Sequence, residues 1–294
     1  MLRIKDYHKE KMQHYREIIS KLGEISVAIV QIGHNPASER YVRNKIKDLE
    51  SVGIKVNLIA KPEDITQEDL ELLIYNLNIS DYTGFIVQLP LAKHLDEKVI
   101  RSMINPDKDI DGFAPTTKLF PCTPQGIITY LEDQNYDFNN KNAVVIGRSA
   151  LVGRPIAEML LDRNCNVSVI HSKTSDANKN YLLANADLIV CATGHRDTIT
   201  DDNLLQNVEW IYDEANNKLE EKKIFNVNSL LIDVGINFDE NGKLVGDCEH
   251  ISGIEKTPVP GGVGLLTRLA LIENILKLKD KMKWDIHTKM LKIL

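Results

Sequence analysis

Apolar runs typical of β-strands alternate with amphipathic runs typical of helices along the whole chain. Such alternation predicts an α/β fold, in which helices cover the faces of largely parallel sheets. In open sheets of this kind, ligands bind in a crevice outside the carboxyl ends of the strands. Side chains that directly follow a strand are therefore candidates for function.

The 294 residues suffice for one large domain or two ordinary ones, and two are favoured. A break is expected between Pro115 and Pro121. Beyond it, Thr123 suits an N-cap and Pro124 the first helical position, so a helix beginning there is expected to link the domains. The last strong helical pattern is expected to pack back on the first domain. The expected boundaries are 1–120 with the C-terminal helix 268–294, and 121–267.

The elements of both domains follow from periodicity and from local start and stop signals. In the first domain we expect a helix near 4–22, a strand at 25–32, a helix opening at Ser38, a strand near 54–60, a helix from Thr66 to about Leu77 and a strand at 84–88. In the second, we expect strands at 143–146, 167–170, 188–192 and 230–234. Helical segments separate the first three, as in a dinucleotide-binding sheet. Residues 213–228 have the composition of a polar insertion.

Composition narrows the class of protein. A hydrophobic content of 43% and a charged content of 27% are typical of soluble globular proteins, and a net charge of −6 argues against nucleic-acid binding. The N-terminus lacks the apolar region of a secretory signal, and no apolar run could span a bilayer. The four cysteines are scattered, and no histidines have metal-ligand spacing. We expect a cytoplasmic protein with buried thiols, no membrane contact and no metal.

The first candidate site is the segment that contains Tyr41 and Lys45. They are four residues apart on an expected helix, so they project side by side. We place them on the flank of the buried stripe, where a ring and an amine could face a cleft and a flat substrate. The alternative is a ring on a core edge beside a lysine that extends to water. The expected stripe is Val42, Ile46, Leu49 and Gly53.

Further polar residues follow the strand near 84–88. Gln88 ends that strand, where its amide could hold a lysine amine by a hydrogen bond. Asp111 belongs to a run of carboxylates, 107–113, beside a turn glycine. Taken alone, such a run is more often a solvated turn than a site.

A cofactor site is expected between the first two strands of the second domain. Gly147, Arg148 and Ser149 form the turn from strand to helix, although the full G-x-G-x-x-G pattern is not present. The glycine permits a tight turn, and the helix N-terminus offers N–H groups to a pyrophosphate. The next strand ends in residues 171–174, His-Ser-Lys-Thr, without the acid that holds the ribose of NAD. Together with Arg148, these donors favour NADP.

Taken together, these motifs resemble those of the bifunctional methylenetetrahydrofolate dehydrogenase/methenyltetrahydrofolate cyclohydrolase family. Eight motifs occur in the family's order and span residues 30 to 275, so the resemblance is specific. They are Ala37-Ser38 through Lys45, Val87-Gln-Leu-Pro-Leu91, Lys108-Asp-Ile-Asp-Gly-Phe113, Pro121-Cys-Thr-Pro124, Gly147-Arg-Ser149, His171-Ser-Lys-Thr174, Asp233-Val-Gly-Ile-Asn237 and Thr257–Gly264.

The resemblance implies a two-domain enzyme, usually a homodimer, that binds folate between the domains. It implies that 5,10-methylenetetrahydrofolate is oxidised with NADP and then hydrolysed to 10-formyltetrahydrofolate. Tyr41 is implied to stack on the folate, Lys45 with Gln88 to activate water or move protons, and Asp111 to bind the pterin edge. Lys45, Gln88 and Asp111 form the catalytic set.

The resemblance also implies further binding residues. The expected NADP contacts are Gly147, Arg148, Ser149, Ser172 and Ile236, and Pro260 and Gly261 are expected to form a wall near both ligands.

Departures from the family pattern indicate a divergent member, and they leave the catalytic set intact, so activity is expected. They are Ala92 after Gln-Leu-Pro-Leu, a shortened segment at 114–120, His195-Arg196 after Gly194, Leu265-Leu266-Thr267 in the final loop, and the insertion near 213–228. Two alternatives stay open: a monofunctional NAD(P)-dependent dehydrogenase acting on folate or another small acid, and a non-catalytic NADP-binding protein on the same scaffold.

Overall fold

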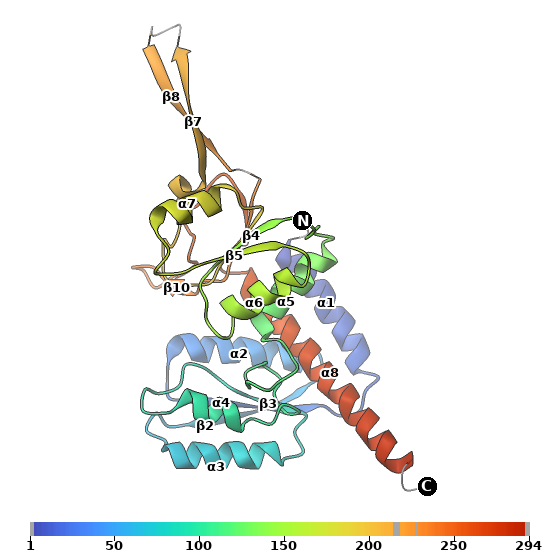
Figure 1. The fold of residues 1–294 in the computed structure, drawn as a ribbon. Coiled ribbons are helices and arrows are strands. Elements are labelled where there is room, and N and C mark those ends of the chain that lie inside the picture. Colours follow the sequence, from blue (N-terminus) through green and yellow to red (C-terminus); the bar gives the residue numbers. More distant parts are fainter. Residues whose placement is uncertain (1–2, 214–217, 227, 292–294) are drawn as a thin grey trace. The chain divides into compact units, whose positions relative to one another are not determined.

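The computed structural model describes residues 3–213, 218–226 and 228–291 (Figure 1). Its chain forms two compact units. The N-terminal unit contains Asp6–Cys122 and the chain from Thr267 onward, whereas the central unit contains Thr123–Leu266 and the first few residues. Each unit is a mixed α/β structure built on a parallel sheet, so the predicted fold class is confirmed.

The sheet of the N-terminal unit has the strand order β2-β1-β3. Its strands are β1 (Ser26–Ile32), β2 (Lys55–Lys61) and β3 (Gly84–Val87), and both neighbouring pairs are parallel. The sheet lies between α2 (Pro36–Ser51) and α3 (Gln67–Asn78), as Figure 1 shows. Residues 27–32 of the central strand β1 are all buried, as expected for a strand covered on both faces.

Three helices of this unit begin at side-chain caps. The Thr66 hydroxyl accepts a hydrogen bond from the Asp69 amide at 3.1 Å, so the predicted start of α3 is confirmed. α2 begins at Pro36, two residues before the predicted start at Ser38, because Asn35 accepts from the Ser38 amide at 3.1 Å. The short helix α4 (Glu97–Met103), capped by Asp96, was not predicted.

The buried face of α2 differs from the predicted stripe. Val42 and Leu49 are buried as expected, but the residue between them on this face is Lys45, which is 2% exposed. Ile46 is only partly buried. Gly53 lies beyond the end of the helix and is exposed, with a φ of 95° that suits a glycine after a helix C-terminus. The flanking position predicted for Lys45 is therefore wrong.

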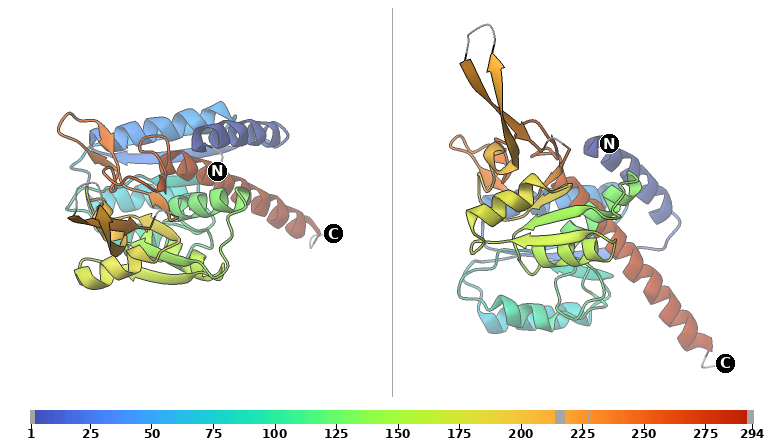
Figure 2. Two further views of the ribbon diagram at one scale, coloured as in Figure 1. Left: turned by 90° about the horizontal axis from the view of Figure 1, so that it is seen from above. Right: turned by 45° about the horizontal axis from the view of Figure 1, so that its top comes forward.

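The last helix, α8 (Val263–Leu291), packs on the N-terminal unit as predicted. Arg268 donates to Asp48 of α2 at 2.6 Å, and Tyr15 of α1 (Ile4–Ile19) donates to Glu273 at 2.5 Å. Residues 269–272 and 275 of α8 are almost fully buried. The run of α8 beside α1 is visible in Figures 1 and 2.

The central unit contains a five-stranded sheet in the order β12-β9-β6-β4-β5. All neighbouring pairs are parallel, and the four predicted strands are present. The helices α5 (Cys122–Asp133), α6 (Gly153–Leu161) and α7 (Asp176–Ala184) accompany the sheet. Its strands are β4 (Asn142–Ile146), β5 (Asn166–Ile170), β6 (Leu188–Cys191), β9 (Leu230–Asp233) and β12 (Glu255–Lys256).

The start of α5 corrects a second prediction. The helix begins at Cys122, so Thr123 lies inside its first turn and is not the N-cap, and Pro124 is the third helical residue. The Cys122 amide donates to the Asp111 carbonyl at 3.3 Å, a contact with a distant loop that the local sequence pattern could not indicate.

A hairpin leads from the central sheet into the stretch predicted to be a polar insertion. It consists of β7 (Leu205–Asp213) and the antiparallel β8 (Lys218–Phe225), after the short 3₁₀ helix η1 (Asp201–Leu204). The right view in Figure 2 shows this hairpin extending from the rest of its unit. Residues 214–217 and 227 of that stretch lie outside the described residues. A smaller hairpin follows β9, formed by β10 (Asn237–Phe238) and β11 (Leu244–Val245).

All four cysteines are buried free thiols, as predicted. Among the described helices, none has a stretch long and apolar enough to cross a lipid bilayer.

Candidate functional site

Lys45 is the centre of a polar cluster in the N-terminal unit. Its Nζ lies 3.2 Å from Gln88 Oε1 and 3.4 Å from Asp111 Oδ2. The lysine side chain is 2% exposed and that of Asp111 26% exposed, so the carboxylate faces solvent while the amine lies behind it. The structure thus brings together the three residues predicted to be catalytic, from segments 43 and 66 residues apart in the chain.

The position of Gln88 follows from the end of strand β3. The backbone N–H of Gln88 still donates to the Val30 carbonyl of β1 at 2.9 Å, which continues the sheet by one residue. Its side-chain Nε2 donates to the Leu89 carbonyl at 2.9 Å. This second bond orients the amide, because the nitrogen faces a carbonyl and the oxygen is left to accept from Lys45.

A tight turn presents Asp111. Asp109 is 1% exposed and accepts from the amides of Phe113 and Ala114 at 3.0 and 2.7 Å. Burial raises the pKa of Asp109, against the opposing effect of these N–H groups. Gly112 has a φ of 70°, and a Cβ there would lie 2.5 Å from the Phe120 carbonyl oxygen. The turn therefore requires glycine, and Asp109 supports the backbone while Asp111 remains accessible.

Asn274 supports the same turn from α8, and sequence reasoning missed it. Its side chain is 0% exposed, and its Nδ2 donates to the carbonyls of Ile110 and Phe120 at 3.2 and 3.4 Å. A third contact reaches Cys122 Sγ at 3.5 Å. The signal available in the sequence was one amide within an otherwise apolar helical stripe.

Tyr41 lies beside the lysine, as predicted. Lys45 Nζ is 5.0 Å from the centroid of the Tyr41 ring, within the range of a cation–π contact. The tyrosine hydroxyl shares a hydrogen bond with Thr267 of α8, a partner that the sequence did not indicate. Burial raises the pKa of Tyr41, so the phenol stays neutral near pH 7.

Two opposing effects act on the pKa of Lys45. Burial by itself lowers it. The charge and the hydrogen bond of Asp111 oppose burial, and the net effect raises the pKa of Lys45 above its usual value. Lys45 is therefore an ammonium ion at neutral pH in this structure. The Cys122 thiol beside it stays protonated, because burial and the charge of Asp111 raise its pKa.

The turn after β4 in the central unit has the shape of a phosphate cradle. Gly147 has a φ of 111°, and a Cβ there would lie 2.4 Å from the Ala192 carbonyl oxygen. A Cβ on Gly153 would lie 2.3 Å from the Gly147 carbonyl oxygen, so strand and helix meet closely. The Ser149 hydroxyl accepts from the Gly153 amide at 3.3 Å and supports the start of α6. Both positions therefore require glycine, because a Cβ at either one would clash with a backbone carbonyl oxygen.

The donors beside this turn fit a phosphorylated ribose. β4 and β5 are adjacent and parallel, so Arg148 and the residues after β5 lie at the same edge of the sheet. Arg148, Ser149, Ser172 and Lys173 are all exposed there. The loop after β5 is ordered by the Thr174 hydroxyl, which accepts from the His171 amide at 3.1 Å. Cations and hydroxyls without a carboxylate at residues 171–174 suit a dinucleotide with a 2′-phosphate.

The remaining predicted binding residues also belong to the central unit. Ile236 follows β9 and is 56% exposed, which is unusual for an isoleucine. Pro260 is exposed in the loop that precedes α8. Gly261 has a φ of 99°, and a Cβ there would lie 2.7 Å from Lys5 Cε.

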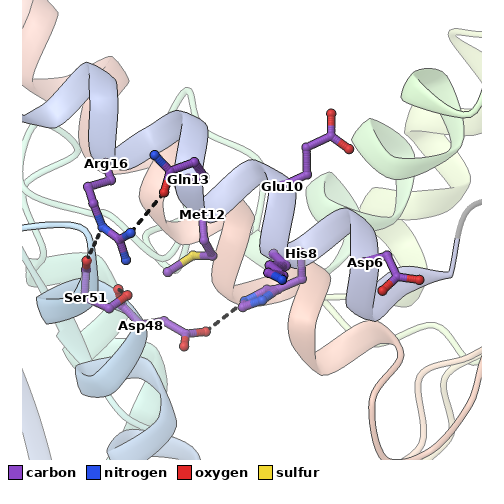
Figure 3. Close-up of a pocket in the computed structure, with 9 residues that line it drawn as sticks. Asp6, His8, Glu10, Met12, Gln13, Arg16, Asp48 and Ser51 are labelled. Carbon is purple, nitrogen blue, oxygen red and sulfur yellow. Dashed lines mark hydrogen bonds and ion pairs between the residues drawn. The ribbon is translucent and has the colours of Figure 1, made fainter.

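A surface cavity of about 630 Å³ lies between α1 and α2 (Figure 3). None of the predicted site residues lines it. In Figure 3, His8 and Asp48 point toward each other, with Nε2 and Oδ2 3.0 Å apart, and Arg16 reaches the Ser51 carbonyl at 2.9 Å. These contacts join helices. The lining residues are Asp6, His8, Lys9, Glu10, Met12, Gln13, Arg16, Asp48 and Ser51.

Comparisons with known proteins find one family along most of the chain. The family model described as tetrahydrofolate dehydrogenase/cyclohydrolase, catalytic domain, matches residues 2–111, and the NAD(P)-binding domain of the same family matches residues 121–225 and 216–283. The bifunctional protein FolD of Listeria innocua is 37% identical over 288 residues, with 93% of each chain covered. That of Streptococcus pneumoniae is 38% identical, with 84% of each covered. The solved structure of the bifunctional enzyme FolD, a methylenetetrahydrofolate dehydrogenase/cyclohydrolase, from Campylobacter jejuni has a TM-score of 0.78 and 36% identity, with 95% of each chain covered.

Proposed function

Because the chain belongs to the tetrahydrofolate dehydrogenase/cyclohydrolase family, we propose that its N-terminal unit binds folate and its central unit binds NADP. The chain has both activities of that family. It oxidises 5,10-methylenetetrahydrofolate to 5,10-methenyltetrahydrofolate and then hydrolyses this product to 10-formyltetrahydrofolate. We further propose which residues carry each role.

The observation that carries the assignment is the buried Lys45 with Gln88 and Asp111 on its Nζ. A lysine that is 2% exposed needs a reason to remain in the interior, because its charge is costly to bury. A carboxylate that is itself open to solvent supplies the counter-charge and can also accept hydrogen bonds from a ligand. This arrangement favours a site for a polar heterocycle over a structural ion pair.

Asp111 and Tyr41 hold the substrate. A carboxylate accepts hydrogen bonds from the donors on a pterin edge, and the Tyr41 ring offers a flat surface for stacking. The ring and the carboxylate both approach Lys45 Nζ, at 5.0 Å from the centroid and 3.4 Å from Oδ2. A folate seated on them places its one-carbon bridge close to the lysine.

The oxidation step depends on positioning. NADP, when bound, accepts the hydride from the one-carbon bridge. The chain therefore needs no base for this step and contributes orientation, with Tyr41 and Asp111 fixing the folate. Arg148, Ser172 and Lys173 select NADP over NAD through the 2′-phosphate.

The hydrolytic step depends on Lys45. Water that adds to the methenyl carbon loses a proton, and an amine fixed by Gln88 can take it. Lys45 must first release its own proton. Pterin donors that engage the Asp111 carboxylate weaken its attraction for the ammonium, so substrate binding lowers the pKa of Lys45 toward the working range. Lys45 then moves a proton between water and the leaving ring nitrogen.

The alternative from the sequence was a monofunctional dehydrogenase. It needs folate contacts but no amine beside the one-carbon bridge. The contact of Lys45 with both Gln88 and Asp111 favours the bifunctional assignment. A non-catalytic binding protein would have no reason to keep a lysine buried against two polar partners.

Two assays on one preparation test the assignment. The first follows oxidation of 5,10-methylenetetrahydrofolate with NADP or NAD, and the second follows hydrolysis of supplied 5,10-methenyltetrahydrofolate. Lys45→Met is expected to reduce hydrolysis at least about 100-fold, the scale of general-base catalysis, and to reduce oxidation less, so that methenyltetrahydrofolate accumulates.

Lys47→Met is the matched control, because Lys47 is an exposed lysine on the same helix. If both activities of Lys45→Met fell in parallel with folate binding unchanged, Lys45 would not be specific to hydrolysis. If neither fell, the site assignment would fail.

Homodimer formation, a cytoplasmic location and the absence of nucleic-acid binding stay predictions. Light scattering on the purified chain measures its oligomeric state directly, and a monomer at micromolar concentration would contradict the first of them.

A further inference from the structure

Asp247 is a buried carboxylate that joins two loops at the carboxyl edge of the central sheet. It is 0% exposed and lies just after β11. Its Oδ2 accepts from the amides of Thr193 and Gly194 at 2.8 and 3.0 Å and from the Thr193 hydroxyl at 2.9 Å. Its Oδ1 accepts from Asn237 Nδ2 at 2.8 Å. One loop follows β6 and the other follows β9.

Both loops lie where a dinucleotide is expected. Ile236, the exposed residue proposed to contact NADP, directly precedes Asn237. The loop after β6 adjoins the phosphate-binding turn, because the Ala192 carbonyl is the atom that a Cβ on Gly147 would meet at 2.4 Å. In open parallel sheets the cofactor crosses the carboxyl ends of the strands at this edge. Asp247 therefore lies beneath the cofactor region and is too buried to touch the ligand itself.

The contacts of Asp247 also determine the orientation of Asn237. Nδ2 of Asn237 donates both to Asp247 Oδ1 and to the Gly246 carbonyl at 3.1 Å. Both partners can only accept, so the amide nitrogen must face inward and the amide oxygen faces away from them. A carboxylate at position 247 thus sets which end of the Asn237 amide is presented beside Ile236.

A second carboxylate holds Asp247 in place. Asp233 Oδ1 accepts from the amides of Gly235 and Asp247, both at 2.9 Å, and its Oδ2 accepts from the Cys248 amide at 2.9 Å. The fit leaves no room for side chains, because a Cβ on Gly235 would lie 2.2 Å from Asp247 Oδ1. Two close, buried acids are costly, and here backbone N–H groups stabilise them. Such an arrangement maintains a defined loop geometry.

We propose that Asp247 is a positioning residue for the dinucleotide: by accepting from Thr193, Gly194 and Asn237 it fixes both loops that hold the cofactor. The inference rests on the proposed NADP site of the central unit. Position 247 requires a side chain that accepts hydrogen bonds and donates none, because each of the groups described above donates to one of its two oxygens. An asparagine of equal size must turn its NH₂ toward one of those donors and so releases one loop.

The test is Asp247→Asn, with NADP binding measured by calorimetric titration in the absence of folate. Removal of one charge-assisted contact is expected to weaken NADP binding about 10-fold to 100-fold. In the same preparation, hydrolysis of supplied methenyltetrahydrofolate should stay within about twofold of the wild type, because that site belongs to the other unit. The KM for methylenetetrahydrofolate should likewise change little.

Asp239→Asn is the matched control. Asp239 also accepts from backbone amides, those of Asn241 and Lys243 at 2.9 and 2.7 Å, but it does so in the turn of the neighbouring hairpin. NADP binding by this variant should equal that of the wild type. If it weakens as much as that of Asp247→Asn, loss of any carboxylate in this region suffices and the proposal is overturned.

Asn237→Ala tests the same contact from the more exposed partner and covers the case in which Asp247→Asn does not fold. It should weaken NADP binding while hydrolysis is retained. If NADP binding by Asp247→Asn or Asn237→Ala matches that of the wild type, the proposal is overturned. Failure of the NADP assignment is distinct, since the wild-type chain itself would then not bind NADP.

Discussion

Lys45 is both a buried residue of α2 and the centre of the polar cluster. It occupies a core position on α2, yet its Nζ contacts two polar groups from distant loops. Burial alone would lower its pKa, but the Asp111 carboxylate reverses the direction and raises it. We therefore expect that a ligand of Asp111 favours release of the Lys45 proton.

Asp111→Asn should lower the pKa of Lys45, because it removes the strongest of the groups that raise it. The base form of an amine exists above its pKa, so a raised pKa keeps wild-type kcat/KM for hydrolysis rising with pH through the neutral range. In the variant, kcat/KM should reach a plateau at lower pH, at a reduced value because pterin contacts are lost. A pH profile of hydrolysis measures both effects. Asp107→Asn, on the same loop, is the control. If the rise of kcat/KM with pH in Asp111→Asn stays where it is in the wild type, or moves to higher pH, Asp111 does not raise the pKa of Lys45.

Tyr41 is predicted to act through its ring. Tyr41→Phe keeps the stacking surface and loses only the hydrogen bond to Thr267, so most activity should remain. Tyr41→Ala should weaken folate binding by about 1 kcal/mol, which is roughly fivefold in Kd. Direct titration with folate measures this difference. Equal damage from both substitutions would mean that the hydroxyl is essential and that stacking is not the role of Tyr41.

At the scale of elements, adjacent strands place residues from separate segments at one edge. The Gly147 amide donates to the Ile170 carbonyl at 2.9 Å, so the turn after β4 and the loop after β5 are hydrogen-bonded neighbours. This pairing brings Arg148 and Lys173 to the same edge of the sheet. We therefore expect selectivity for a phosphorylated ribose to depend on the β4–β5 pair and not on either strand alone.

Arg148→Ala should raise the KM for NADP about tenfold and leave the KM for NAD nearly unchanged, because only NADP carries the 2′-phosphate. Dehydrogenase assays with each cofactor give the ratio. Arg154→Ala is the matched control, an exposed arginine in the first turn of α6. Equal effects of Arg148→Ala on both cofactors would remove the 2′-phosphate assignment.

Within the N-terminal unit as a whole, Asp48 joins three helices. It lies on α2 and accepts from His8 of α1 and from Arg268 of α8 at 3.0 and 2.6 Å. Burial by itself raises the pKa of Asp48, but the hydrogen bonds and charges of His8 and Arg268 outweigh it and hold the pKa below its usual 3.8. The helix α2, which carries Lys45, is thereby hydrogen-bonded to both α1 and α8.

Asp48→Asn should reduce the free energy of unfolding near pH 7 by about 2 kcal/mol, because Arg268 and His8 lose a largely buried anionic partner. A depressed carboxyl pKa stabilises the fold above the unfolded-state pKa, and this contribution is lost as pH falls through the lower folded-state pKa. The difference between variant and wild type should therefore shrink in acid. Urea denaturation followed by circular dichroism at several pH values measures it. Glu50→Gln, at an exposed position of the same helix, should change little, and a difference that grew in acid would contradict the linkage.

The local sequence pattern determined most of the secondary structure of this protein. The alternation of strands and helices predicted both sheets, and the Thr66 cap predicted the start of α3, because side-chain period and capping are properties of a few neighbouring residues. The family motifs likewise located Lys45, Gln88 and Asp111 before any geometry was known. The short elements α4 and β12 were not predicted, because a segment of a few residues shows too little periodicity.

Only the tertiary structure decided which polar groups the interior accepts. The position of Lys45 in the core depends on Asp111, 66 residues away, and the burial of Asp247 depends on amides 53 and 54 residues away. Asn274 meets its partners across more than 150 residues. A buried charge or amide is stable only where distant groups replace its hydration, and no local pattern records which groups these will be.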